Sequence, residues 1–157
     1  MQPAPNQPMG FCLGLIFRRT TMGSRTGSDA HDVIFGSAGA DLLSGMGGND
    51  MLFGGAGADT IISGTNIDVL IGGAGADTFI FQRGDGADLI ADARIGIDHV
   101  LIIGVEQDEV SFHAGEDGTL QAWYGGTDGS AADHGTITLS GYTMNDVGAM
   151  RDLFIFG

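Results

Sequence analysis

Residues 27–80 read, in blocks of nine, GSDAHDVIF, GSAGADLLS, GMGGNDMLF, GGAGADTII, SGTNIDVLI and GGAGADTFI. An aspartate occupies the sixth place of every block: Asp32, Asp41, Asp50, Asp59, Asp68 and Asp77. An apolar residue occupies the eighth place: Ile34, Leu43, Leu52, Ile61, Leu70 and Phe79. Six blocks in one register without an insertion indicate an internal repeat, and this repeat decides the fold.

A period of nine fits neither a helix of 3.6 residues per turn nor an isolated strand. It fits a glycine-rich turn of six residues followed by a strand of three, with the eighth residue pointing inward. Two blocks then form one coil of a flattened roll, and stacked coils place like turns roughly 4.8 Å apart. We therefore predict an all-β fold, a parallel β-roll (β-helix or solenoid) over residues 27–81 with a C-terminal antiparallel β cap over residues 82–157.

Stacking arranges the aspartates in two columns. Asp32, Asp50 and Asp68 follow one edge of the roll, the odd edge, and Asp41, Asp59 and Asp77 follow the other, the even edge. Two carboxylates about 4 Å apart repel by roughly 4 kcal/mol at an effective dielectric constant of about 20, so a cation between them is expected. Oxygen ligands without histidine or cysteine favour a hard cation, and Ca2+ tolerates flexible geometry better than Mg2+.

The blocks resemble the RTX nonapeptide repeat, GGxGxDxUx, a Ca2+-binding β-helix repeat. Residues 54–62 and 72–80 agree with the pattern at every defined place, whereas residues 36–44 differ only at Ser37 and residues 45–53 only at Met46. The resemblance implies that Ca2+ lies between stacked turns, held by the six Asp side chains and by carbonyls from places one to four. The implied carbonyl ligands belong to Gly36, Ala38, Gly45, Gly47, Gly54, Gly55, Ala56, Gly57, Gly72 and Ala74.

Two blocks depart further from the pattern, and both contribute to the odd edge. The first has Ala30 at place four. The fifth has Ser63, Thr65 and Asn66, although asparagine adopts the left-handed region more readily than most residues. We therefore predict well-formed sites on the even edge and weaker sites on the odd edge.

The composition suits a chain that is neutralised by cations. The 157 residues carry a formal net charge of −14, with a sequence pI of about 4.1 and no lysine. Such acidity argues against nucleic acids, anionic membrane surfaces and polyanions as partners. Cys12 is the only cysteine, so no disulfide forms within the chain, and stability outside the cell would have to come from metal.

Residues 1–26 are predicted to be a poorly ordered N-terminal tail. The apolar run at residues 9–17 is too short to span a membrane, and no basic segment precedes it, as a conventional signal peptide would require. A segment that touches a membrane and an artefact of the gene boundary are the alternatives.

After the repeats, Asp88, Asp92 and Asp98 resemble the segment that follows the repeats in serralysin-type proteases and alginate-epimerase accessory modules. One of them could hold a further Ca2+, or all three could be surface turn residues. Strands are predicted at residues 119–124 and 136–140, and a helical turn is predicted at residues 145–150. The apolar C-terminal end resembles the uncleaved signal of type I secretion, and a capping strand accounts for it equally well.

Patterns of catalytic residues are missing from the sequence. HExxH, GxSxG, the P-loop pattern, CxxC and the EF-hand loop are all absent, and the four histidines have no metal-ligand spacing. Trp123 and Tyr124 are interpreted as packing residues, with stacking on a sugar as the alternative. We therefore expect no catalytic activity from this chain alone.

The sequence favours a secreted, extracellular bacterial Ca2+-binding module that leaves the cell unfolded through type I secretion machinery and folds on binding Ca2+ outside. Three alternatives stay open. One is an accessory module of a secreted protease or polysaccharide-modifying enzyme whose catalytic part is a separate chain. Another is a Ca2+-dependent surface or adhesive protein that contacts a cell-surface polymer. The third is an enzyme with a site in residues 82–157.

Overall fold

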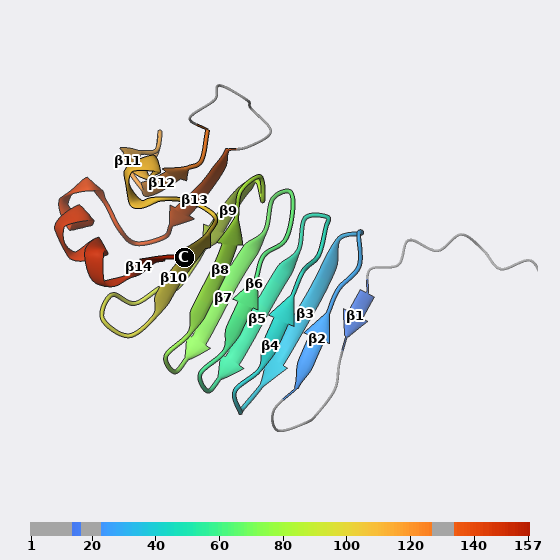
Figure 1. Ribbon diagram of the computed structural model, residues 1–157. Coiled ribbons are helices and arrows are strands. Elements are labelled where there is room, and N and C mark those ends of the chain that lie inside the picture. Colours follow the sequence, from blue (N-terminus) through green and yellow to red (C-terminus); the bar gives the residue numbers. More distant parts are fainter. Residues whose placement is uncertain (1–13, 17–22, 127–133) are drawn as a thin grey trace, which may run out of the picture.

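The computed structural model describes residues 14–16, 23–126 and 134–157 and shows a stack of coils, each giving one strand to each of two sheets (Figure 1). In stacking order, the first sheet contains β1 (Gly14–Ile16), β3 (Asp32–Ser37), β5 (Met51–Ala56), β7 (Val69–Ala74), β9 (Ala87–Ile90), β13 (Gly135–Leu139), β12 (Leu120–Tyr124) and β11 (Ser111–Ala114). The second contains β2 (Ser24–Thr26), β4 (Leu42–Ser44), β6 (Thr60–Ile62), β8 (Thr78–Gln82), β10 (His99–Ile103) and β14 (Phe154–Phe156). The predicted all-β parallel β-roll is confirmed.

The core of the roll is the row of eighth-place residues. All six of them, from Ile34 to Phe79, are fully buried, as the repeat predicts. Parallel pairing brings equivalent positions together from coil to coil, as in the pairs Ile34–Leu52 and Leu52–Leu70. The inner row is therefore one continuous apolar stack between the two sheets.

The strands of the first sheet are longer than the repeat predicts. Strands β4 and β6 have the expected three residues, but β3, β5 and β7 have six each. Their pairing continues into the next block, where Ser37 pairs with Gly55 and Gly55 with Gly73. A methyl group on Gly55 would lie 2.2 Å from the Ser37 carbonyl oxygen, so the lack of a side chain lets the backbones approach this closely.

The stack extends beyond both predicted boundaries of the roll. Strand β9 pairs in parallel with β7, and β10 pairs in parallel with β8, although both lie after residue 81. At the other end, β2 pairs with β4 and β1 with β3, so paired strands begin within the stretch predicted as a tail. The remainder of that predicted tail, residues 1–13 and 17–22, lies outside the described residues.

The cap joins both sheets through parallel strands and is antiparallel only in part. Strands β11, β12 and β13 pair antiparallel with one another, but β13 pairs parallel with β9 and β14 pairs parallel with β10. Between them lie the 3-10 helices η1 (Gln107–Glu109) and η3 (Met144–Asp152). The helical turn predicted at residues 145–150 falls inside η3, and Thr143 and Asp146 form its capping box.

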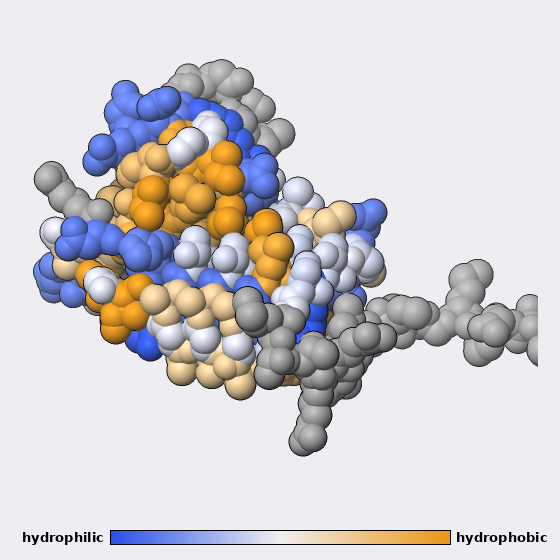
Figure 2. All heavy atoms as spheres, turned by 60° about the horizontal axis from the view of Figure 1, so that its bottom comes forward, coloured by the Kyte–Doolittle hydropathy of each residue, from blue (hydrophilic) through white to orange (hydrophobic). Residues whose placement is uncertain are grey.

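The cap also determines the surface at this end of the molecule. Figure 2 shows apolar side chains gathered at the cap end of the face in view. A groove of about 470 Å³ there is lined mainly by Val110, Phe112, Val147, Met150, Phe154 and Phe156. Of the two residues interpreted as packing, Tyr124 is buried, whereas Trp123 is half exposed and its ring lies 4.5 Å from that of His113. None of the described helices has the length and apolar character needed to cross a membrane.

Candidate metal centre

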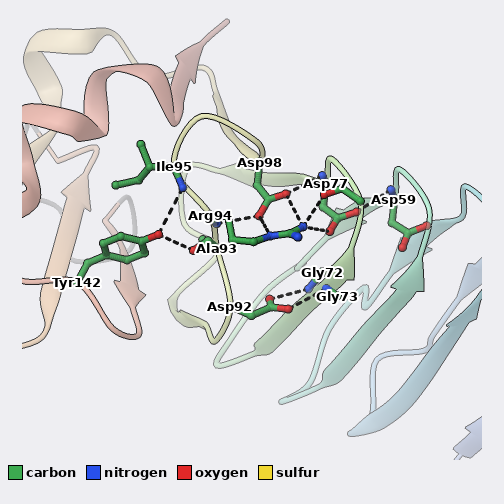
Figure 3. Close-up of polar contacts among 11 residues, drawn as sticks. Asp59, Gly72, Gly73, Asp77, Asp92, Ala93, Arg94, Ile95, Asp98 and Tyr142 are labelled. Carbon is green, nitrogen blue, oxygen red and sulfur yellow. Dashed lines mark hydrogen bonds and ion pairs between the residues drawn. The ribbon is translucent and has the colours of Figure 1, made fainter.

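The sixth-place aspartates form two hydrogen-bonded columns. On the odd edge, Oδ1 of Asp50, Asp68 and Asp88 accepts the backbone N–H of the aspartate one coil earlier, at 2.8, 2.8 and 2.9 Å. On the even edge, Oδ1 of Asp59, Asp77 and Asp98 does the same at 2.8, 3.0 and 3.0 Å. Figure 3 shows the end of the even edge. One oxygen of each carboxylate therefore holds successive coils together, and the other is left for a different partner.

That second oxygen is buried without a hydrogen-bond partner in the middle of the stack. Among the described residues, Oδ2 of Asp50, Asp59, Asp68, Asp77 and Asp88 is buried and has no hydrogen-bond partner. These five side chains belong to residues that are at most 2 % exposed. A buried carboxylate oxygen without a partner is costly, so its position calls for a positive charge or a proton.

Carbonyl oxygens converge on the same positions. A methyl group on Gly45 would lie 2.5 Å from Oδ2 of Asp50 and 2.2 Å from the Ser63 carbonyl oxygen. A methyl group on Gly54 would lie 2.5 Å from Oδ2 of Asp59 and 2.6 Å from the Gly72 carbonyl oxygen. The glycine at place one thus leaves a cradle between coils, lined by a carboxylate and a carbonyl of the next coil. This oxygen-only donor set fits Ca2+.

The first coil is built differently from those that follow. Oδ2 of Asp32 accepts the N–H and the hydroxyl of Ser28 at 2.7 and 2.8 Å, and Oδ2 of Asp41 accepts the same groups of Ser37 at 2.5 and 2.7 Å. The Oδ2 atoms are therefore hydrogen bonded in the first coil, and those of the columns from Asp50 to Asp88 have no such partner, on both edges alike. The prediction that the even edge holds the better sites stays a prediction.

Burial changes the acidity of the columns. It raises the pKa of Asp68 to about 7 and that of Asp88 to about 8, against the opposing effect of the N–H donors. Burial also raises the pKa values of Asp50, Asp59 and Asp77. In the folded stack without metal, burial therefore favours the protonated carboxylates. A proton then removes the negative charge that a bound cation would otherwise balance.

The three later aspartates have different roles. Asp88 and Asp98 extend the two columns, with spacings of 20 and 21 residues in place of 18. Asp92 accepts the N–H groups of Gly72 and Gly73 at 2.8 Å each, one with each oxygen (Figure 3). Asp92 therefore closes the last turn by hydrogen bonds, and the column positions belong to the other two residues.

Sequence reasoning missed Asp85. It is only 5 % exposed, and its Oδ2 accepts the Gln82 N–H at 2.6 Å and the Ser63 hydroxyl at 3.4 Å. Burial raises its pKa to about 6. The signal lay in the five residues GADLI at 86–90, which repeat the GADLL of residues 39–43 and place Asp85 in the turn of a seventh block.

Among the remaining predicted carbonyl ligands, the structure shows a hydrogen bond for Ala74. The Ala74 carbonyl accepts the Gly57 N–H at 2.7 Å and so takes part in coil stacking. The ligand role of all ten predicted carbonyls, Ala38, Gly47 and Ala56 among them, stays a prediction. Within the described part of the chain, no three His, Cys, Asp or Glu side chains gather closely enough to hold a metal ion by themselves.

The comparisons with known proteins agree with this geometry. A family model, the RTX calcium-binding nonapeptide repeat (four copies), matches residues 26–61 and 53–90. Residues 26–90 are RTX repeats. The family implies calcium as their ligand, and the cradles of the RTX stack are made of the oxygens that this ion prefers.

Solved structures resemble more than four fifths of the chain and extend the likeness beyond the RTX repeats. The AlgE6R3 subunit of the Azotobacter vinelandii mannuronan C5-epimerase is 25% identical, with a TM-score of 0.60, over 82% of this chain and 80% of that one. The AlgE6R2 subunit of the same enzyme, 24% identical with a TM-score of 0.57 over 88% of this chain and 92% of that one, shares the fold. No curated protein matches the chain.

Proposed function

We propose that the chain is a Ca2+-binding module that folds when it binds Ca2+ after export and has no catalytic activity of its own. The observation that supports this proposal is the set of buried Oδ2 atoms without hydrogen-bond partners in Asp50, Asp59, Asp68 and Asp88, since Arg94 lies beside that of Asp77. Without a cation these carboxylates are both desolvated and mutually repulsive, which opposes stacking. A bound Ca2+ would offset both costs, so its binding free energy would become folding free energy.

In this proposal the ligands are the aspartates of the two columns and main-chain carbonyls at the turns. The carbonyls of Gly45, Gly54 and Gly72 are the strongest candidates among those predicted, because each points toward the cradle beside the glycine one coil earlier. Each column aspartate is hydrogen bonded to the next, so an ion that orders one coil also orients the carboxylate of its neighbour. Cooperative binding is therefore expected.

The test is far-UV circular dichroism during a Ca2+ titration from a calcium-free start, with Mg2+ as the competing ion. The proposal expects a cooperative change from coil to β structure with Ca2+ alone. Asp68→Asn should weaken the response, whereas Asp108→Asn, which removes an exposed carboxylate outside the columns, should not. A full β spectrum in calcium-free buffer above pH 8, where the column carboxylates are ionised, would contradict folding on binding.

We further propose export by type I secretion to the extracellular medium, which the family supports because RTX repeat proteins are typically secreted. The test is expression in a bacterium that carries a type I exporter, with the protein measured in the medium. Removing residues 152–157 should abolish secretion. Because β14 pairs with β10, the deletion could also disturb the fold. Ile155→Asp is therefore a second variant, which changes only the partly exposed middle residue of β14. Its fold is checked in Ca2+. Secretion of both variants at the normal level would contradict the proposal.

A second candidate is an accessory module of a polysaccharide-modifying enzyme, favoured by the likeness to two subunits of a mannuronan C5-epimerase. Calorimetric titration of the Ca2+-loaded protein with mannuronan, with a neutral glucan as control, tests it. Selective binding would support this candidate, and equal or no binding would contradict it. Ca2+-dependent multimers in size-exclusion chromatography would favour a surface or adhesive protein in its place.

A further inference from the structure

The even edge ends at an arginine. Arg94 lies in the loop between β9 and β10, and its Nη2 is 3.6 Å from Oδ2 of Asp77 and 3.1 Å from Oδ1 of Asp98 (Figure 3). Its Nε donates to Oδ2 of Asp98 at 3.1 Å. Nη2 also donates to the carbonyl oxygen of Gly75. The guanidinium therefore lies between two column carboxylates and contacts a turn carbonyl.

These are the same kinds of oxygen that line the cradles of the earlier coils. The step from Asp77 to Asp98 continues the column that runs from Asp59 to Asp77, with the same N–H to Oδ1 hydrogen bond at 3.0 Å. One coil earlier, Oδ2 of Asp59 is buried with no hydrogen-bond partner. In the last step, the corresponding Oδ2 of Asp77 faces the positive charge of Arg94.

The sequence places this charge at a position that the repeat reserves for glycine. When the block is aligned on Asp98 as its sixth place, Gly96 falls at place four and Val100 at place eight, as the RTX pattern requires. Arg94 then falls at place two, where the pattern has glycine. Among the blocks aligned in this way, a long cationic side chain occupies place two only in the block that ends this edge.

The loop that carries Arg94 is fixed by the cap. The Tyr142 hydroxyl donates to the Ala93 carbonyl at 2.8 Å and accepts the Ile95 N–H at 3.3 Å (Figure 3). The Arg94 backbone N–H itself donates to Oδ2 of Asp98 at 2.8 Å. Tyr142 and Asp98 therefore both hold the loop that positions the guanidinium. A planar, permanently charged donor suits a position between two carboxylates.

We infer that the guanidinium of Arg94 takes the place of Ca2+ at the last position of the even edge, so that this coil closes without metal. The inference rests on the proposed Ca2+ binding of the other coils. It has two consequences: the even edge binds one ion fewer than its column of carboxylates would allow, and the coil next to the cap is ordered before Ca2+ arrives.

The test counts bound Ca2+ by equilibrium dialysis in the wild-type protein and in three variants. Arg94→Gln should bind one more ion per chain than the wild type, because it exposes the oxygens of Asp77, Asp98 and Gly75. Arg94→Lys keeps the charge and should leave the count unchanged. Arg83→Gln is the matched control, since Arg83 pairs with Glu109 at 2.5 Å at the same end of the molecule.

An unchanged count in Arg94→Gln, with bound Ca2+ in the wild type, would overturn the inference. A wild type that binds no Ca2+ would instead overturn the proposed function. Hydrogen exchange of the wild type in calcium-free buffer gives a second measurement that does not depend on a variant's folding. Amides of β10 should exchange at least tenfold more slowly than those of β4 and β6, and equal rates would also overturn the inference.

Discussion

Acid should replace calcium in stabilising the stack. Burial raises the pKa of Asp68 to about 7 and that of Asp88 to about 8, whereas an unfolded aspartate titrates near 3.9. At a pH between the unfolded pKa and the folded pKa values, the folded, calcium-free protein holds protons that the unfolded chain has lost. The stabilisation is therefore complete below about pH 4 and is lost as the pH rises through 7 to 8.

The expected size follows from the number of protons involved. Each retained proton changes the free energy of unfolding by about 1.4 kcal/mol per pH unit. The two carboxylates are coupled, since Oδ1 of Asp88 accepts the Asp68 N–H and each charge opposes the other, so we count one proton for the pair. From pH 5 to pH 7 the calcium-free protein should lose roughly 3 kcal/mol, a large part of a typical domain stability of about 5–15 kcal/mol.

The assay is circular dichroism of the calcium-free protein at half-unit steps from pH 5 to pH 8, with urea unfolding at each pH where the calcium-free chain is still folded. The buffers are freed of calcium on a chelating resin, because soluble chelators change their affinity with pH. In saturating Ca2+ the trend should reverse, because the ion needs deprotonated ligands. The double variant Asp68→Asn, Asp88→Asn is the control and should flatten the calcium-free profile. A calcium-free stability that is constant or rises from pH 5 to pH 7 would refute the reasoning.

Three further substitutions have expected signs. Asp59→Asn should raise the Ca2+ midpoint about tenfold, which is equivalent to roughly 1.4 kcal/mol of binding free energy. It should not lower the stability of the calcium-free protein, and paired titrations of variant and wild type measure both. Gly57→Ala should cost over 2 kcal/mol in thermal unfolding because its methyl would lie 2.6 Å from the Gly39 carbonyl carbon, whereas Gly96→Ala, with open space, should cost only about 1 kcal/mol. Met46→Gly should raise the free energy of unfolding by about 1 kcal/mol, since Met46 has φ 79° and a half-exposed side chain.

The nine-residue period was enough to predict the columns and the core, because parallel stacking repeats each place at a fixed spacing. It also predicted that Asn66 could adopt the left-handed region, and Asn66 has φ 88°. The period could not reveal that Asp88 and Asp98 continue the columns, since two and three additional residues enter these coils. Nor could it show that β14 returns to pair with β10, because that contact depends on the packing of the cap between them.

The last carboxylates of each column need a positive charge or a hydrogen-bond donor, which a cap that only covers the buried apolar residues does not provide. A capping element of a repeat protein must hide the open core, but here it must also satisfy the last charges. At the first coil, Ser28 and Ser37 donate to Asp32 and Asp41 from within their own turns. At the far end of the even edge, Arg94 forms ion pairs with both of the final carboxylates. Groups of the chain itself thus close the even edge at both ends, and the oxygens left for a bound cation lie in the coils between them.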